Sequence, residues 1–213
     1  MVKEGLAGPS TVDWALIDWR KAERSRYRLQ KRIYKAASRG NVQVVHNLQR
    51  KLMRSWSARI LAVRRVTQDN AGKKTAGVDG KTALTAAERV ALVQELEPKQ
   101  RKKRKHLPVR RVWIPKPGKP EKRPLGIPTI RDRTEQAIAK EALEPEWEAK
   151  FEPNSYGFRP GRSQHDAIAA IFLSIKQKDK YVLDADIRGA FDHISHQALL
   201  EPAGNIPNNE TVH

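Results

Sequence analysis

The sequence contains no cysteine and no long apolar run. Without cysteine, disulfides, thiolate metal sites and a cysteine nucleophile are excluded. No apolar stretch approaches the roughly 18 residues that a membrane-spanning helix needs. The first ten residues also lack the basic-then-apolar pattern of a signal peptide. These features favour a soluble cytoplasmic protein that is not in a membrane. Apolar residues make up only 38% of the chain, so much of its surface is expected to be polar or to rest on a partner.

Acidic residues are scarce in two segments. Residues 20–65 hold 15 Lys or Arg and one acid, and residues 99–123 hold 12 Lys or Arg and one acid. The rest of the chain is mildly acidic, so the net charge of +18 belongs to these two segments. A solvated helix face normally mixes both signs. The imbalance favours a nucleic acid as partner over an anionic membrane surface, which needs a bulky apolar face opposite the bases.

The first basic segment has helical periodicity. Apolar residues recur every three to four positions from about residue 18 to 38, and again from Val45 to Thr67. Between them Arg39, Gly40 and Asn41 break the pattern, which predicts an antiparallel helical hairpin with bases facing outward. Three apolar members of the second run are expected to be plain core: Leu48, Trp56 and Ile60.

The middle of the chain alternates between helix and strand signals. Thr85 followed by Glu88 is a capping box that predicts a helix over residues 85–97. Residues 99–106 form a charge run typical of a flexible linker. The segments 110–114 and 125–130 have strand character around a proline-rich turn, and they predict a β-hairpin.

The last third of the chain predicts two helices and a strand. A helix is expected over residues 134–149, and Ser163 is expected to cap a second one that ends near Lys176. The apolar residues of the second helix should face inward; they are Ala167, Ile168, Ile171, Phe172 and Ile175. Residues 181–187 then read as a strand. Because helix and strand alternate without a strict βαβ rhythm, the fold class is α+β.

Two carboxylates, Asp184 and Asp186, lie on this last predicted strand. Residues two apart on a strand point to the same side, so the pair can bind Mg²⁺ through oxygen. A pair of this spacing alone more often faces water at a strand end. The longer pattern, with Gly189, Phe191 and Asp192 following the apolar strand, is more specific.

Lys116 and Arg123 lie near the tip of the predicted hairpin. On a folded tip both can reach one triphosphate, the lysine as a point charge and the arginine as a fork. A solvated turn with nonspecific charge is an equally good interpretation of these residues in isolation. The segment is not a P-loop, because Gly118-Lys119 lacks the earlier glycine and the following Ser or Thr.

Taken together, these segments resemble the amino-terminal part of a group II intron-encoded reverse transcriptase/maturase. The matching strings are LQKRIYKAASRGN, RRVWIPKPGKPEKRPLGIPTIRDR, ALEPEWEAKFEPNSYGFRPGRSQHDAI and YVLDADIRGAFDHISH. The resemblance covers residues 14–200. It implies a basic helical N-terminal region, then reverse-transcriptase fingers, then the start of a palm. The implied segments are a loose N-terminus (1–17), a helical domain (18–98), a basic linker (99–109), fingers with partial palm (110–200) and a non-matching tail (201–213).

The resemblance implies roles for individual residues. Asp186 matches the first catalytic aspartate, a Mg²⁺ ligand in nucleotidyl transfer. The implied contacts to a dNTP come from Lys116, Arg123, Ile187, Arg188, Gly189, Ala190 and Phe191, with Phe191 as the gate against a 2′-hydroxyl. For Asp184 and Asp192 we expect only a role in positioning the strand. The implied contacts to intron RNA or template come from Arg24, Arg28, Lys31, Arg32, Lys35, Arg54, Arg64, Arg65, Pro124, Leu125, Gly126, Arg159 and Arg162.

The sequence departs from the family's pattern in one respect. The family places a second catalytic element, an aromatic-Ala-Asp-Asp turn, after the first aspartate, and these 213 residues contain no Asp-Asp pair. We therefore expect a truncated family member that is inactive alone or needs a downstream palm/thumb chain. The alternative is a non-catalytic RNA-binding module that assists intron splicing. A generic basic protein of ribosomal type is the weaker third interpretation, because it needs no nucleotide-site pattern.

Overall fold

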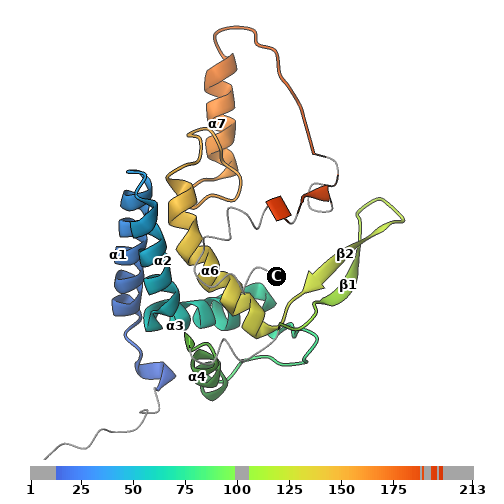
Figure 1. Cartoon of the computed structure of the whole chain (residues 1–213). Helices are drawn as coiled ribbons and strands as arrows, with labels where there is room; N and C mark the ends of the chain where they lie inside the picture. The colour runs from blue at the N-terminus through green and yellow to red at the C-terminus, as the bar shows by residue number, and fades with distance from the viewer. Residues whose placement is uncertain (1–12, 99–105, 188, 190–192, 196, 199–213) are drawn as a thin grey trace, which may run out of the picture. The chain divides into compact units, whose positions relative to one another are not determined.

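The computed structural model describes residues 13–98, 106–187, 189, 193–195 and 197–198. It combines helices with one two-stranded antiparallel sheet, so the predicted α+β class is confirmed (Figure 1). Two compact units are distinguished: residues 1–31 with 50–142, and residues 32–49 with 143–213. No helix in the described part of the chain is long and apolar enough to cross a membrane.

The elements follow one another in chain order. They are η1 (Trp14–Leu16), α1 (Trp19–Ala37), α2 (Val42–Arg54), α3 (Trp56–Arg64), η2 (Arg65–Asp69), η3 (Ala71–Lys74), α4 (Ala86–Glu95), β1 (Arg110–Pro115), β2 (Lys122–Ile127), α6 (Ile130–Glu148) and α7 (Gln164–Ile175). The predicted linker lies mostly outside the described residues, since residues 99–105 are not among them.

Helix α3 is the core of the first unit. Its residues 58–63 are all buried, which is the pattern of a helix that is covered on every side. One of them, Arg59, is charged; its Nη1 lies 3.4 Å from Glu97 Oε1 and 3.5 Å from the carbonyl oxygen of Val93. The ion pair and the carbonyl contact, both made by Nη1, offset part of the cost of burying this charge, while Nε has no hydrogen-bond partner.

Ser55 divides the second predicted helix in two. The periodicity of residues 45–67 predicts one continuous helix, but the Ser55 side chain accepts a hydrogen bond from the backbone N–H of Ala58 and starts a new helix there. Leu48 and Ile60 are core as expected, whereas Trp56 is 41% exposed. The expectation for Trp56 was wrong because the new cap places it in the first turn of α3, at the surface.

The loop that precedes α4 is held by the start of α6. Arg133 donates hydrogen bonds from its guanidinium to the backbone carbonyls of Gly72 and Thr75. Burial lowers the pKa of this guanidinium. Gly77 lies against the backbone of Thr129, where a Cβ atom would come within 2.6 Å of the Thr129 Cα. Only glycine fits this close approach of two backbones.

The β-hairpin is formed with a shorter turn than predicted. Arg110 pairs with Ile127 and Pro115 pairs with Lys122, so β2 begins three residues before the predicted returning strand. Pro124 lies inside β2 opposite Trp113. A proline is tolerated there because a two-stranded ribbon consists only of edge strands.

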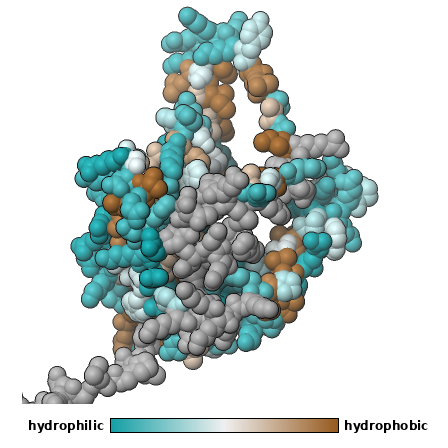
Figure 2. Space-filling view, in the orientation of Figure 1, coloured by the Kyte–Doolittle hydropathy of each residue, from teal (hydrophilic) through white to brown (hydrophobic). Residues whose placement is uncertain are grey.

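In the second unit the apolar side of α7 is exposed. Ser163 caps this helix as predicted, and together with Asp166 it forms a capping box. The residues expected to face inward do not: Ile168, Ile171 and Phe172 are each about 60% exposed, and Figure 2 shows apolar residues along α7. That expectation was wrong because no described element of this unit covers the helix.

The last predicted strand is not formed in the described part of the chain. Residues 181–187 are exposed and are not assigned to a strand. A strand needs a hydrogen-bonded neighbour, and β1 and β2 are the only paired strands among the described residues.

Candidate nucleic-acid interface

Three bases of α1 form a basic stripe, defined here as Arg24, Arg28 and Lys31. Their spacing of four and three residues places them on one helix face, and all three are exposed. The neighbouring Leu29 is buried, so the amphipathic pattern fixes which face is outside. In the described part of the chain none of the three has a carboxylate partner. The other two bases predicted on this helix, Arg32 and Lys35, are exposed as well.

Arg64 is placed differently from the bases of the stripe. Its guanidinium carbon lies 4.8 Å from the ring centroid of Trp19. Its nitrogen atoms also lie within 3.8 Å of Glu23 and 3.7 Å of Asp69. This side chain is therefore held by the protein, while the predicted RNA-contacting residues Arg54 and Arg65 are exposed.

Lys116 and Arg123 share one face of the hairpin. The register places Arg123 opposite Ile114, and the backbone N–H of Lys116 donates to the carbonyl of Glu121. Because side chains alternate along a strand, Lys116 and Arg123 are diagonal neighbours on the same face. Lys116 Nζ also lies 3.1 Å from the carboxylate of Glu121, which neutralises part of its charge.

The predicted template segment Pro124, Leu125 and Gly126 belongs to β2. Leu125 is 44% exposed and lies opposite Val112. A Cβ atom at Gly126 would come within 3.1 Å of the Val109 side chain, so a larger residue there would press on the approach to β1. All three template-segment residues are exposed.

Arg159 holds the loop before α7. Its guanidinium donates two hydrogen bonds to Glu148 and two more to the carbonyls of Glu152 and Ser155. Four of its five N–H groups are thus engaged within the second unit. Arg162 is exposed and stacks over the Tyr156 ring at 5.7 Å.

The predicted catalytic residues are only partly described. Asp186, Ile187 and Gly189 are exposed, whereas Arg188, Ala190, Phe191 and Asp192 lie outside the described residues. The described residues place no other carboxylate against Asp184 and Asp186 in a three-ligand cluster. The Mg²⁺ site that the resemblance implies at Asp186 therefore stays a prediction.

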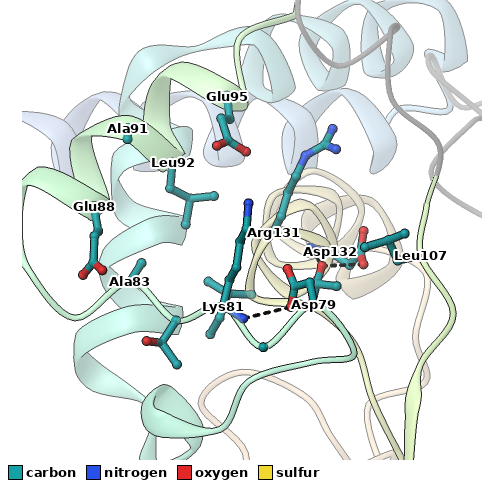
Figure 3. A pocket seen from close by; sticks show the side chains of 14 residues that line it. Asp79, Lys81, Ala83, Glu88, Ala91, Leu92, Glu95, Leu107, Arg131 and Asp132 are labelled. Carbon is teal, nitrogen blue, oxygen red and sulfur yellow. Dashed lines mark hydrogen bonds between the residues drawn. The ribbon is translucent and has the colours of Figure 1, made fainter.

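A hollow between α4 and the start of α6 was not anticipated from the sequence (Figure 3). Its volume is about 780 Å³, and its rim mixes the acids Asp79 and Glu95 with the bases Lys81 and Arg131. Glu88 also lines it, and hydrogen bonds from Thr85 lower the pKa of this carboxyl. The mixture of signs at the rim favours no single ligand charge.

One cluster of possible metal ligands borders this hollow: His106, Asp132 and Glu135. Asp132 accepts hydrogen bonds from Thr129 at 2.6 Å and lies 3.0 Å from the His106 ring nitrogen. Glu135 accepts from Arg131 at 3.0 Å. Each carboxylate already has a role in starting α6 or in pairing along it, so the cluster is explained by the protein itself.

Comparison with known proteins places these features in a family. A family model described as the N-terminal domain of reverse transcriptase matches residues 14–96. A second, described as reverse transcriptase (RNA-dependent DNA polymerase), matches residues 114–211. Together the two models cover most of the sequence.

Three curated relatives show similarity over parts of the chain. Protein YkfC of Escherichia coli is 39% identical over 143 residues, which is 64% of this chain and 37% of the relative. Maturase-like protein 1 of Euglena gracilis is 30% identical over 194 residues, 86% of this chain and 40% of the relative. Group II intron-encoded protein LtrA of Lactococcus lactis is 41% identical over 93 residues, 44% of this chain and 15% of the relative. The matched regions thus span less than half of each relative.

Proposed function

Because the chain belongs to the reverse transcriptase family, we propose that it binds RNA through the basic stripe of α1. The observation that carries the proposal is the exposure of Arg24, Arg28 and Lys31 on one helix face without carboxylate partners in the described residues. A base that no protein carboxylate neutralises can pair with a phosphate and release a counterion, which is the main source of nucleic-acid affinity.

The RNA that we propose is that of a group II intron. Two of the relatives, a maturase-like protein and a group II intron-encoded protein, support this choice by their names. The hairpin adds a second basic surface through Lys116 and Arg123, of which Lys116 is partly neutralised by Glu121. Phosphate contacts position a protein on RNA without reading its sequence, so the stripe accounts for affinity and not for the choice of intron.

The test is the salt dependence of binding to a fluorescently labelled intron RNA fragment, measured by anisotropy. The variant Arg24→Ala/Arg28→Ala removes two bases of the stripe. The slope of log K against log salt should become shallower by about 1.4, because each phosphate contact on a single strand contributes roughly 0.7. An unchanged slope would overturn the proposal.

The matched control is Lys178→Ala/Lys180→Ala. These two lysines are exposed beyond α7 and their removal changes the net charge by the same amount. The control should keep the slope of the unaltered chain. An equal loss in both double variants would mean that net charge, and not the stripe, governs binding.

We also propose that nucleotide addition requires carboxylates that these 213 residues lack. Reverse transcriptases use a divalent metal ion, and a two-ion site needs ligands from more than one acidic residue. Asp186 supplies one candidate ligand, while Lys116 and Arg123 would bind the triphosphate charge. We therefore expect a polypeptide of these 213 residues to bind RNA and to need further carboxylates for nucleotide addition.

A further inference from the structure

Trp56 lines a cavity at the surface of the first unit. The cavity has a volume of about 580 Å³, which is within the range of about 300–1,000 Å³ that is usual for small-ligand sites. Trp56 is 41% exposed, although it is the first residue of α3, a helix whose residues 58–63 are all buried. An aromatic ring at the edge of a hollow offers a flat surface on which another ring can stack.

The other walls of the cavity are mostly apolar. Leu16, which is 82% exposed, and Ile17 come from the segment that precedes α1. Ala22, from the first turns of α1, is buried at the cavity. A flat ring inside the cavity can therefore contact the aliphatic carbon atoms of these residues and, elsewhere on its surface, the indole of Trp56.

Two carboxylates at the rim retain a free acceptor. Asp13 accepts the backbone N–H of Ala15, and Asp18 accepts that of Lys21, in each case through one oxygen, Oδ1. Within the described residues the second oxygen of each carboxylate, Oδ2, accepts no hydrogen bond. Carboxylates that accept from an exocyclic amine are a known means of reading a nucleobase edge.

The cavity is continuous with the basic stripe along α1. Lys21 lines the cavity, and Arg24 and Arg28 follow it three and seven residues later on the same side of the helix. Seven residues of α-helix rise about 10 Å. An RNA strand whose phosphates contact Arg24 and Arg28 would therefore pass the mouth of the cavity.

We propose that this cavity takes one unpaired nucleobase of the bound RNA, stacked on Trp56, with its exocyclic amine directed at Asp13 or Asp18. The proposal rests on the RNA binding proposed above and adds a preference for single-stranded segments. An apolar side chain of a partner protein would also fit the walls of the cavity. The adjacent basic stripe favours a polyanion instead, because no carboxylate of the described residues neutralises its arginine and lysine side chains.

The experiment compares a single-stranded RNA 12-mer with a blunt RNA duplex of the same length, each measured against the full chain by anisotropy. Trp56→Ala should weaken binding of the single strand roughly tenfold, because base–aromatic stacking by one residue is worth about 5- to 150-fold. Binding of the duplex should not change, because its nucleobases are paired with each other and cannot enter the cavity. Trp56→Phe should restore most of the single-strand affinity, which a misfolded variant would not do.

A matched control is Trp147→Ala. Trp147 is 43% exposed, lies on α6 and is covered by Lys150 at 5.0 Å, and it lines neither of the two cavities described above. Its removal should leave both affinities unchanged. In addition, Asp18→Asn keeps a side-chain oxygen for the cap and should reduce any preference for amine-bearing bases over uracil.

The outcomes separate this inference from the proposed function. If Trp56→Ala changes neither affinity while Arg24→Ala/Arg28→Ala lowers both, the cavity proposal is overturned and RNA binding by the stripe stands. If Trp56→Ala lowers single-strand and duplex binding equally, Trp56 acts through the structure and the proposal is again overturned. If the arginine variant lowers neither, the proposed function itself fails.

Discussion

Arg159 and Glu148 form a bidentate ion pair, in which Arg159 Nε lies 3.0 Å from Glu148 Oε2 and Arg159 Nη2 lies 2.6 Å from Glu148 Oε1. The same guanidinium donates to the carbonyls of Glu152 and Ser155, so one side chain ties the end of α6 to the loop that follows it. The resemblance assigns Arg159 a template contact, which stays a prediction. In the described structure its charge is already used to position the loop, and the neighbouring Arg162 is the exposed base.

Glu148→Gln should loosen this loop. The amide cannot accept two charge-assisted hydrogen bonds, and it leaves a largely buried guanidinium partly unpaired. We expect a melting temperature lower by roughly 2–6 °C and faster proteolytic cleavage within residues 152–162. Glu152→Gln is the control, because Arg159 uses only the backbone carbonyl of that residue. Equal effects of the two substitutions would contradict the assignment.

The same pair predicts a loss of stability in acid. The hydrogen bond from Arg159 lowers the pKa of the Glu148 carboxyl below its usual value near 4.5. A carboxyl with a lowered folded-state pKa stabilises the fold fully above the unfolded-state value, and this contribution is lost as the pH falls through the folded-state value. As the pH falls from 5 through the folded-state pKa of Glu148, the melting temperature of the unaltered chain should therefore drop more than that of the Glu148→Gln variant. Parallel curves would contradict this.

Gly77→Ala should destabilise the first unit. The added methyl would lie 2.6 Å from the Cα and 2.7 Å from the backbone nitrogen of Thr129, and neither atom can move without shifting the start of α6. Overpacking of this kind costs about 1–3 kcal/mol, measurable by urea unfolding. Gly72→Ala is the matched control, because its nearest neighbour is the Arg133 Nη1 at an ordinary 3.6 Å. If Gly72→Ala lost as much stability, the loss would come from the change in backbone flexibility on replacing glycine, and not from the contact of the new methyl group with Thr129.

The features that the sequence predicted well depend only on residues that are close together along the chain. The capping box at Thr85 and the helix cap at Ser163 are both present as predicted, because each depends only on a hydroxyl at the start of a helical pattern and on the residues that follow it. The outward direction of the basic side chains on α1 could likewise be predicted, because helical spacing alone decides which side chains share a face. The existence of the hairpin also followed from local strand signals, although β2 begins three residues before the predicted returning strand.

The features that failed depend on what packs against them. Trp56 belongs to an apolar periodicity, and only the cap at Ser55 turns it outward. Ile171 and Phe172 follow a buried-helix pattern, yet periodicity cannot say whether a neighbour is there to cover them. The strand expected at residues 181–187 fails for the same reason, since a strand needs a partner that sequence does not supply. The cavity beside Trp56 combines two segments about forty residues apart, so no local signal could reveal it.

Arg123→Ala should weaken triphosphate binding, and Glu121→Gln should strengthen it. Arg123 and Lys116 share a hairpin face, and Glu121 neutralises Lys116 at 3.1 Å. Exposed ion pairs contribute about 0.2–1 kcal/mol, so releasing Lys116 should raise affinity for a fluorescent nucleoside triphosphate by up to about fivefold. Lys119→Ala, at the hairpin turn, is the control for nonspecific charge. If Glu121→Gln lowers the affinity, the proposed triphosphate contact is wrong.

The 213-residue polypeptide should bind RNA without extending a primer on it. Asp186 is its candidate metal ligand, but the sequence contains no Asp-Asp pair to complete a two-ion site, so the developing charge on the transferred phosphate would lack its counter-ions. The measurement is primer extension on an RNA template with dNTPs and Mg²⁺, beside an intact reverse transcriptase that shows the assay works. Addition of a separate chain that supplies the aromatic-Ala-Asp-Asp turn and thumb tests whether the missing ligands restore activity. Extension by the polypeptide alone that Asp186→Ala abolishes would contradict this expectation, because one aspartate would then suffice.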